Sequence, residues 1–138
     1  MITKPDLTVV ILTFNEELHI HRAIESAWKV AREVIIVDSF STDRTVQIAM
    51  ESGAQVLQNP FVNQAQQFQW AMDHDHVRTV WTMRMDADEY LTDALVAEIT
   101  QKLPGLETGI SGVVLKRQVH FMGKWIRHGG YYPVHLLR

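Results

Sequence analysis

Three carboxylates follow one another at the end of an apolar stretch of the sequence. Residues 79–85, TVWTMRM, are typical of a buried strand, and Asp86, Asp88 and Glu89 come directly after them. Like charges this close together raise each other's pKa and resist burial, so a compensating partner is expected. Residues i and i+2 of an extended chain point the same way, so Asp86 and Asp88 can direct two carboxylates at one point. Two hard oxygen ligands of this kind suit Mg²⁺ or Mn²⁺.

An Asp-x-Asp pair also occurs by chance in many chains, where it forms a solvated turn. Here such a turn would lead into a helix that Thr92 can cap. The position of the pair after a strand decides between the two interpretations, because parallel sheets bind ligands at the carboxyl ends of their strands. That position favours the metal site.

Strand-like and helix-like segments alternate along the chain. Strands are expected at residues 7–14, 33–38, 54–58 and 79–85, with a further strand at 112–121. Helices are expected around Ile20–Ala31, Val46–Met50, Phe61–Met72 and Leu95–Leu103. This order predicts an α/β fold, with a mainly parallel sheet and helices on both faces. The polar residues at the expected strand ends are Asn15, Glu16, Asp38, Asp86 and Asp88.

The first two strand ends carry different signals. Asp38 ends the second strand, where nucleotide-binding sheets often keep an acid for a ribose hydroxyl, although Asp is also an ordinary turn former. The first turn, TFNEE (13–17), contains no glycine. Dinucleotide folds and Walker-type NTPases need glycine there so that the backbone can approach phosphates, and both classes are therefore disfavoured. Any diphosphate bound here would depend on a metal at Asp86 and Asp88.

Composition places the chain in the class of soluble globular domains. Its 138 residues suffice for one domain, and 46% of them are apolar. The chain has no cysteine, so a metal would need oxygen or nitrogen ligands. The first residues, MITKPDL, lack an apolar signal core, and no apolar run approaches the ~20 residues of a membrane span. We therefore expect a cytoplasmic protein.

Charge is divided unevenly along the chain. Residues 1–107 hold all 16 acidic residues against 8 Lys and Arg, whereas residues 108–138 hold five basic residues and no carboxylate. This split predicts that the basic part faces an anionic partner, which includes the inner membrane surface. A solvated basic face that balances an acidic one explains the same charges. No nucleic-acid partner is expected.

Four blocks of the sequence resemble the family 2 glycosyltransferases with the GT-A fold. They are VVILTFNEE (9–17), IIVDSFSTDRT (35–45), QFQWAM (67–72) and MRMDADEYL (83–91). A fifth block, HFMGKWIRHGGYYP (120–133), resembles the branch that builds bacterial lipopolysaccharide core and other surface glycans. The resemblance implies a GT-A sheet. It also implies inverting transfer of a sugar from a nucleotide diphosphate donor, usually UDP-linked, to a glycan or lipopolysaccharide-core acceptor. By the same resemblance, the basic residues 108–138 would meet a phosphorylated or lipid-linked acceptor.

The resemblance also implies roles for individual residues. Thr13, Phe14, Asn15 and Glu16 would line the pocket for the base and ribose, and Asp38 would bond the uracil or ribose. Asp86 would touch the ribose or the sugar, and Asp88 would ligate a Mg²⁺ or Mn²⁺ that bridges the diphosphate. Gln67 would also lie at the donor, where many relatives carry Arg or Lys near the diphosphate.

The catalytic base is the missing element. In the family that base is an Asp or Glu well downstream of the metal motif, but the last carboxylate here is Glu107. His128 is a weak substitute that better suits an acceptor contact. We therefore expect residues 1–138 to form one nucleotide-sugar-binding domain, incomplete at its C-terminus, with an acceptor-side part from about residue 108. Two alternatives stay open: a truncated binding domain without turnover, and a sugar nucleotidyltransferase, which normally opens with a glycine-rich loop.

Overall fold

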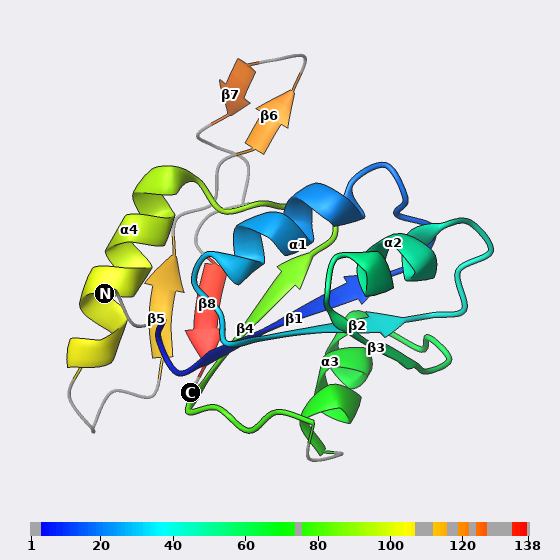
Figure 1. Ribbon diagram of the computed structural model, residues 1–138, viewed down its shortest axis with the longest axis horizontal. Helices are drawn as coiled ribbons and strands as arrows, with labels where there is room; N and C mark the ends of the chain where they lie inside the picture. Colours follow the sequence, from blue (N-terminus) through cyan, green and yellow to red (C-terminus); the bar gives the residue numbers. More distant parts are fainter. Residues whose placement is uncertain are drawn as a thin grey trace.

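The computed structural model of the protein describes residues 4–73, 76–106, 112–115, 119–121, 124–126 and 134–137. Its centre is a six-stranded sheet in the order β3-β2-β1-β4-β8-β5 (Figure 1). The strands are β1 (Leu7–Thr13), β2 (Glu33–Asp38), β3 (Gln55–Gln58), β4 (Trp81–Asp86), β5 (Gly112–Leu115) and β8 (Val134–Leu137). The first four are mutually parallel, and β8 runs antiparallel to both β4 and β5. The predicted mainly parallel α/β sheet is confirmed.

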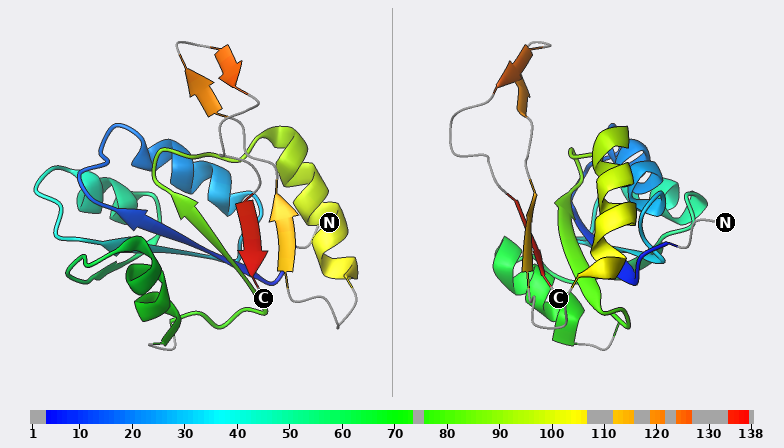
Figure 2. Two further views of the ribbon diagram at one scale, coloured as in Figure 1. Left: turned by 180° about the vertical axis from the view of Figure 1, so that it is seen from behind. Right: turned by 90° about the vertical axis from the view of Figure 1, so that its left-hand side faces the viewer.

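Helices cover both faces of this sheet. Buried contacts place α1 (Ile20–Trp28), α2 (Thr45–Glu51) and α4 (Asp93–Lys102) on one face, and α3 (Gln64–Asp73) lies on the other (Figure 2). A short 3₁₀ turn, η1 (Leu103–Gly105), follows α4. Two-sided cover requires strands that are apolar on both faces, and the uninterrupted apolar run of β1 meets this requirement.

Alternate residues of the central strands belong to two separate hydrophobic cores, one on each face of the sheet. On β1, Val9 and Ile11 belong to the core beneath α1, α2 and α4, whereas Val10 belongs to the core beneath α3. Each of these side chains is fully buried. Burial of one such aliphatic side chain stabilises the fold by roughly 1.5–3 kcal/mol. The two cores together therefore hold β1 and β2 rigidly, and with them the loops at their carboxyl ends.

The third helix begins later than its apolar spacing predicted. Asn63 Oδ1 accepts a hydrogen bond from the Gln66 N–H at 2.8 Å, which is the bond that an N-cap residue makes. The helix therefore starts at Gln64, and Phe61 lies outside it with an exposed side chain. The fully buried residues of α3 are Gln67 and Ala71, so the predicted face through Phe61 and Ala65 was wrong.

The predicted strand at 112–121 is in fact two strands with different partners. β5 pairs with β8 in the main sheet, whereas β6 (Val119–Phe121) pairs with β7 (Lys124–Ile126) in a two-stranded sheet of its own. Polar residues 116–118 (KRQ) separate the two short apolar runs. The sequence shows the runs, but it does not show that each has its own pairing partner.

The predicted helix cap at Thr92 is confirmed. Thr92 Oγ1 accepts a bond from the Leu95 N–H at 3.2 Å and so caps α4. Gly53 follows the end of α2 at φ +84°, a conformation that glycine adopts without strain. Within the described ranges, every helix is too short or too polar to cross a lipid bilayer.

Candidate functional site

The carboxyl ends of three strands lie side by side at one edge of the sheet. The register of the parallel strands sets Thr13 of β1 beside Asp38 of β2, and Leu12 of β1 beside Asp86 of β4. The loops that leave these ends carry Glu16, Asp43, Asp86 and Asp88, which we call the acidic edge. The sequence analysis placed Glu16, Asp86 and Asp88 at strand ends, and the order β2-β1-β4 explains why they share one edge.

Burial and repulsion between the carboxylates of the acidic edge both raise the pKa of Glu16. Burial raises the pKa of this carboxyl, and the nearby negative charge of Asp88 raises it further. Asp43 and Asp86 act in the same direction, and only His19 opposes them. Carboxylates from the loops after β1, β2 and β4 therefore share one electrostatic environment. Such a site favours a cation.

The turn after β4 uses one of its carboxylates for its own structure. Glu89 Oε1 accepts a bond from the Asp86 N–H at 2.7 Å, and the Glu89 N–H donates to the Asp86 carbonyl at 3.0 Å. The turn is also tied to α1, because the Leu91 N–H donates to Ser26 Oγ at 3.0 Å. Asp88 is exposed at the tip, so the turn is fixed while this carboxylate faces solvent.

The donor set at the acidic edge fits a hard divalent cation that a second molecule also ligates. Across the described ranges, no three His, Asp or Glu side chains are arranged to hold a metal ion. Mg²⁺ is usually bound through one or two carboxylates, with substrate phosphates and water completing its shell. In a metal site, Asp86 and Asp88 would supply such a pair, and these two residues by themselves are not a complete protein cage.

Asp38 is the most deeply buried of the predicted site residues. Its side chain is 0% exposed and accepts hydrogen bonds from the Thr13 hydroxyl at 2.7 Å and from the Ser41 N–H at 2.8 Å, as well as from the Ser41 hydroxyl. These bonds join β1 to the loop after β2. Asp38 therefore stabilises the turn that follows β2, which is the role of a turn former. Its contact with a nucleotide stays a prediction.

The loops after β1 and β2 are joined by reciprocal hydrogen bonds. We call residues 15–17 and 41–45 together the loop clasp. The Asn15 N–H donates to Ser41 Oγ at 2.8 Å, and the Thr42 N–H donates back to Asn15 Oδ1 at 2.8 Å. The Glu16 N–H donates to Thr45 Oγ1 at 2.8 Å. Asn15 holds φ +50°, which Asn tolerates better than most residues.

Asp43 completes the loop clasp. Burial acts to raise its pKa, but hydrogen bonds from the Thr45 hydroxyl and N–H and from the Glu17 N–H outweigh this and lower it. Sequence analysis missed these bonds to the first loop. The signal was the polar run STDRT (41–45), whose partners lie 26 to 29 residues earlier in the chain.

Gln67 occupies an internal position in the structure. It is 1% exposed, and its Nε2 donates to Ser39 Oγ at 3.1 Å and to the Asn59 carbonyl at 3.0 Å. Its Oε1 accepts from Asn59 Nδ2 at 2.8 Å. Gln67 thus ties together the ends of β2 and β3. Direct contact between Gln67 and a donor stays a prediction.

The remaining predicted residues divide by exposure. Thr13 is buried with its hydroxyl on Asp38, whereas Phe14 leaves the same strand with its ring more than half exposed. Glu107 and the weak base candidate His128 lie outside the described residues. The structure therefore brings together the nucleotide and metal candidates from residues 13–16, 38, 86 and 88.

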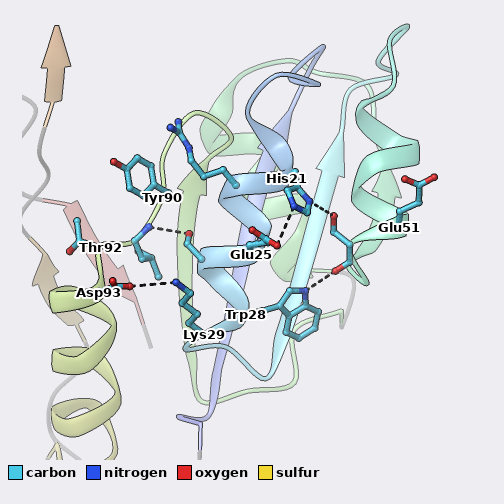
Figure 3. Close-up of a pocket in the computed structure, with 12 residues that line it drawn as sticks. His21, Glu25, Trp28, Lys29, Glu51, Tyr90, Thr92 and Asp93 are labelled. Carbon is cyan, nitrogen blue, oxygen red and sulfur yellow. Dashed lines mark hydrogen bonds and ion pairs between the residues drawn. The ribbon is translucent and has the colours of Figure 1, made fainter. Parts of the chain in front are cut away.

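An open groove of about 890 Å³ runs across the outer side of α1 (Figure 3), and none of the residues that line it belongs to the acidic edge. Polar side chains in the groove contact one another: Lys29 Nζ lies 3.4 Å from Asp93 Oδ1, and His21 Nε2 lies 3.2 Å from Glu25 Oε1. Its Tyr90 ring is covered by Arg22, 4.4 Å from the ring centroid. Lys29, His21 and Arg22 therefore each already have a partner among the residues that line the groove.

Comparison with known proteins decides the family. The model for "Glycosyl transferase family 2" matches residues 8–134, which is most of the chain. The chain belongs to glycosyl transferase family 2. The resemblance seen in the sequence blocks is thereby confirmed.

Family 2 relatives of this chain are longer proteins. It is 40% identical over 99 residues to an uncharacterized glycosyltransferase of Rickettsia bellii, covering 72% of this chain and 33% of that protein. It is 34% identical over 128 residues to the lipopolysaccharide core biosynthesis glycosyltransferase LpsC of Rhizobium meliloti, covering 89% of this chain and 46% of LpsC. The chain therefore spans between a third and a half of the length of these relatives.

Solved structures of glycosyltransferases share the fold. Glucosyl-3-phosphoglycerate synthase from Mycobacterium tuberculosis, in complex with UDP, has a TM-score of 0.60 at 25% identity, with 77% of this chain and 42% of that chain covered. The mannosyltransferase PcManGT from Pyrobaculum calidifontis, in complex with GDP-Man and Mn²⁺, has a TM-score of 0.65 at 20% identity, covering 83% and 36%. The expected GT-A architecture is confirmed.

Proposed function

We propose that this chain is the donor-binding part of an inverting family 2 glycosyltransferase. Its donor is a UDP-sugar, and its acceptor is a glycan or the lipopolysaccharide core of a bacterial envelope. The observation that carries the proposal is the acidic edge, where carboxylates from three adjacent strand ends meet on a family 2 sheet. The name of the relative LpsC supports the acceptor class, and the UDP complex of the synthase supports the donor class.

Each part of the edge has a task in donor binding. Asp88, exposed at the tip of a fixed turn, and Asp86 at the strand end would hold Mg²⁺ or Mn²⁺ against the donor diphosphate. Such a metal supplies positive charge that stabilises the departing diphosphate. The loop clasp holds Asn15 and Glu16 beside the same edge, where they would face the nucleoside.

Turnover requires a second set of groups. An inverting transfer needs a base within hydrogen-bond reach of the acceptor hydroxyl, on the side opposite the departing diphosphate. The carboxylates of the acidic edge lie on the diphosphate side, so the base would come from the acceptor side. In the proposal residues 108–138, with their five basic residues and no carboxylate, begin this acceptor side and face an anionic acceptor or membrane surface.

Metal-dependent nucleotide binding tests the donor role. Calorimetric titration with UDP should show tighter binding in the presence of Mn²⁺ for the parent chain and lose this gain in Asp88→Ala. Asp88→Asn should be nearly as damaging, because the amide keeps the shape and loses the charge. Asp73→Ala, which removes an exposed carboxylate from α3, is the matched control and should behave as the parent does. Equal, metal-independent binding in the parent and in Asp88→Ala would reject the metal role.

A transfer assay separates the enzyme from a binding domain without turnover. The 138-residue chain should bind UDP and transfer sugar negligibly, and a longer protein that includes the downstream segment should transfer. Robust transfer by the short chain, abolished by His128→Ala, would instead make His128 the base. The sugar nucleotidyltransferase alternative loses support, because the chain matches family 2 and its first loop has no glycine.

A further inference from the structure

Phe40 has a backbone conformation that large side chains rarely adopt. It lies two residues beyond the end of β2 at φ +60°, in the left-handed region that favours glycine and, among other residues, Asn and Asp. Its ring is 54% exposed, so burial of the ring does not explain why a phenylalanine occupies this position.

The residues on either side impose this conformation. The Ser39 N–H donates to the Thr13 carbonyl at 3.0 Å, and the Ser41 N–H donates to Asp38 at 2.8 Å. With both neighbours anchored, the chain cannot relax around Phe40. Strain that the surroundings maintain in this way is concentrated at ligand sites.

Phe40 is the middle of three exposed phenylalanines at neighbouring strand ends. Phe14 follows β1 and Phe61 follows β3, and each is 56% exposed. In the strand order β3-β2-β1-β4 the three rings leave the β1, β2 and β3 ends, whereas Asp86 and Asp88 leave the β4 end. Neighbouring strands are about 4.8 Å apart, so the segments that carry these phenylalanines and the Asp86–Asp88 pair follow neighbouring strand ends along one edge of the sheet.

We infer that Phe40 is a contact for the nucleobase of the donor. This inference rests on the proposed function. A nucleoside diphosphate carries a flat aromatic base at one end and a diphosphate at the other, so a diphosphate held at β4 directs its base toward the ends of β1 and β2. Aromatic side chains bind bases through their faces, whatever the base. Phe40 is exposed and follows the end of β2, so it is available on that side.

A ligand with a base and a ligand without one distinguish a base contact from a general effect on the site. UDP and inorganic pyrophosphate are titrated by calorimetry, each with Mn²⁺, into the parent, Phe40→Asn and Phe40→Tyr. Asn tolerates φ +60° and removes the ring, whereas Tyr keeps the ring. Phe40→Asn should weaken UDP binding by about tenfold, leave pyrophosphate binding unchanged, and melt no lower than the parent. Phe40→Tyr should bind UDP as the parent does, and so should Met50→Ala, which shortens an exposed apolar side chain on α2.

Each other result overturns the inference. Unchanged UDP affinity in Phe40→Asn would show that the ring does not contact the base, and the proposed donor site would stand. An equal loss of affinity for UDP and for pyrophosphate in Phe40→Asn would show that the ring only supports the loop. A parent chain that binds neither ligand would remove the proposed function, and the base contact with it.

Discussion

Replacement of Asp38 tests whether buried hydrogen bonds at the end of β2 build the site. The Asp38 carboxylate is fully buried and accepts bonds from the Thr13 hydroxyl and from both the N–H and the hydroxyl of Ser41. A hydrogen bond to a charged group is worth about 1.5–3 kcal/mol, and a buried donor left without a partner costs about 1–3 kcal/mol. The hydroxyls can turn to other acceptors, but the Ser41 N–H cannot. We therefore expect Asp38→Ala to lower the free energy of unfolding by about 3 kcal/mol.

Asp38→Asn should cost less, about 1 kcal/mol, because its amide oxygen can still accept from the Ser41 N–H while the two hydroxyls reorient. Urea denaturation followed by circular dichroism measures both values, and the melting temperature of Asp38→Ala should fall by about 10 °C. Asp73→Ala, at an exposed position on α3, should stay within about 0.5 kcal/mol of the parent. If Asp38→Ala is as stable as that control, the carboxylate does not support the loop and the reasoning fails.

Two further predictions concern the same edge. The pKa of Glu16 is raised above its ordinary value of 4.5, so its charged form costs stability at higher pH, and this cost disappears once the pH falls below that value. Glu16→Gln should therefore raise the melting temperature at pH ~7 and leave it unchanged at pH ~3.5. An equal rise in melting temperature at both pH values would contradict the electrostatic cause. Gln67→Leu should lose about 2 kcal/mol, because Ser39 and Asn59 lose their partner, whereas Gln69→Leu on the exposed side of α3 should lose little. Equal stability of the two variants in thermal melts would remove the structural role of Gln67.

Much of the fold could be predicted because its signals are local. The apolar runs of β1 and β2 and the N-cap at Thr92 each lie within a few residues, and the structure confirms them. The start of α3 was missed although its signal was also local, because the spacing through Phe61 outweighed the cap at Asn63. The division of residues 112–121 between two sheets could not be predicted, since strand pairing depends on residues 124–126 and 134–137.

The candidate site was predictable in position and less so in detail. Alternating strands and helices place Asp38 and Asp86 at one edge, but spacing cannot tell which side chain faces a ligand and which faces inward. Burial separates them, with Asp38 and Gln67 inside and Asp88 outside. The loop clasp escaped prediction because its bonds join residues from two loops that only the sheet brings together.

The loop clasp has a consequence for the thermodynamics of donor binding. Fixing the backbone of a disordered loop costs about 1–2 kcal/mol per residue, and a site that orders only on binding loses that amount from its affinity. Here the bonds from Asn15 to Ser41 and from Glu16 to Thr45 hold both loops in the free chain. If the proposed function holds, a donor that meets these loops would find its contacts preorganised. These loops contain no glycine, so their backbone is unsuited to close contact with phosphates. Their side chains are instead held in place by the hydrogen bonds between the loops.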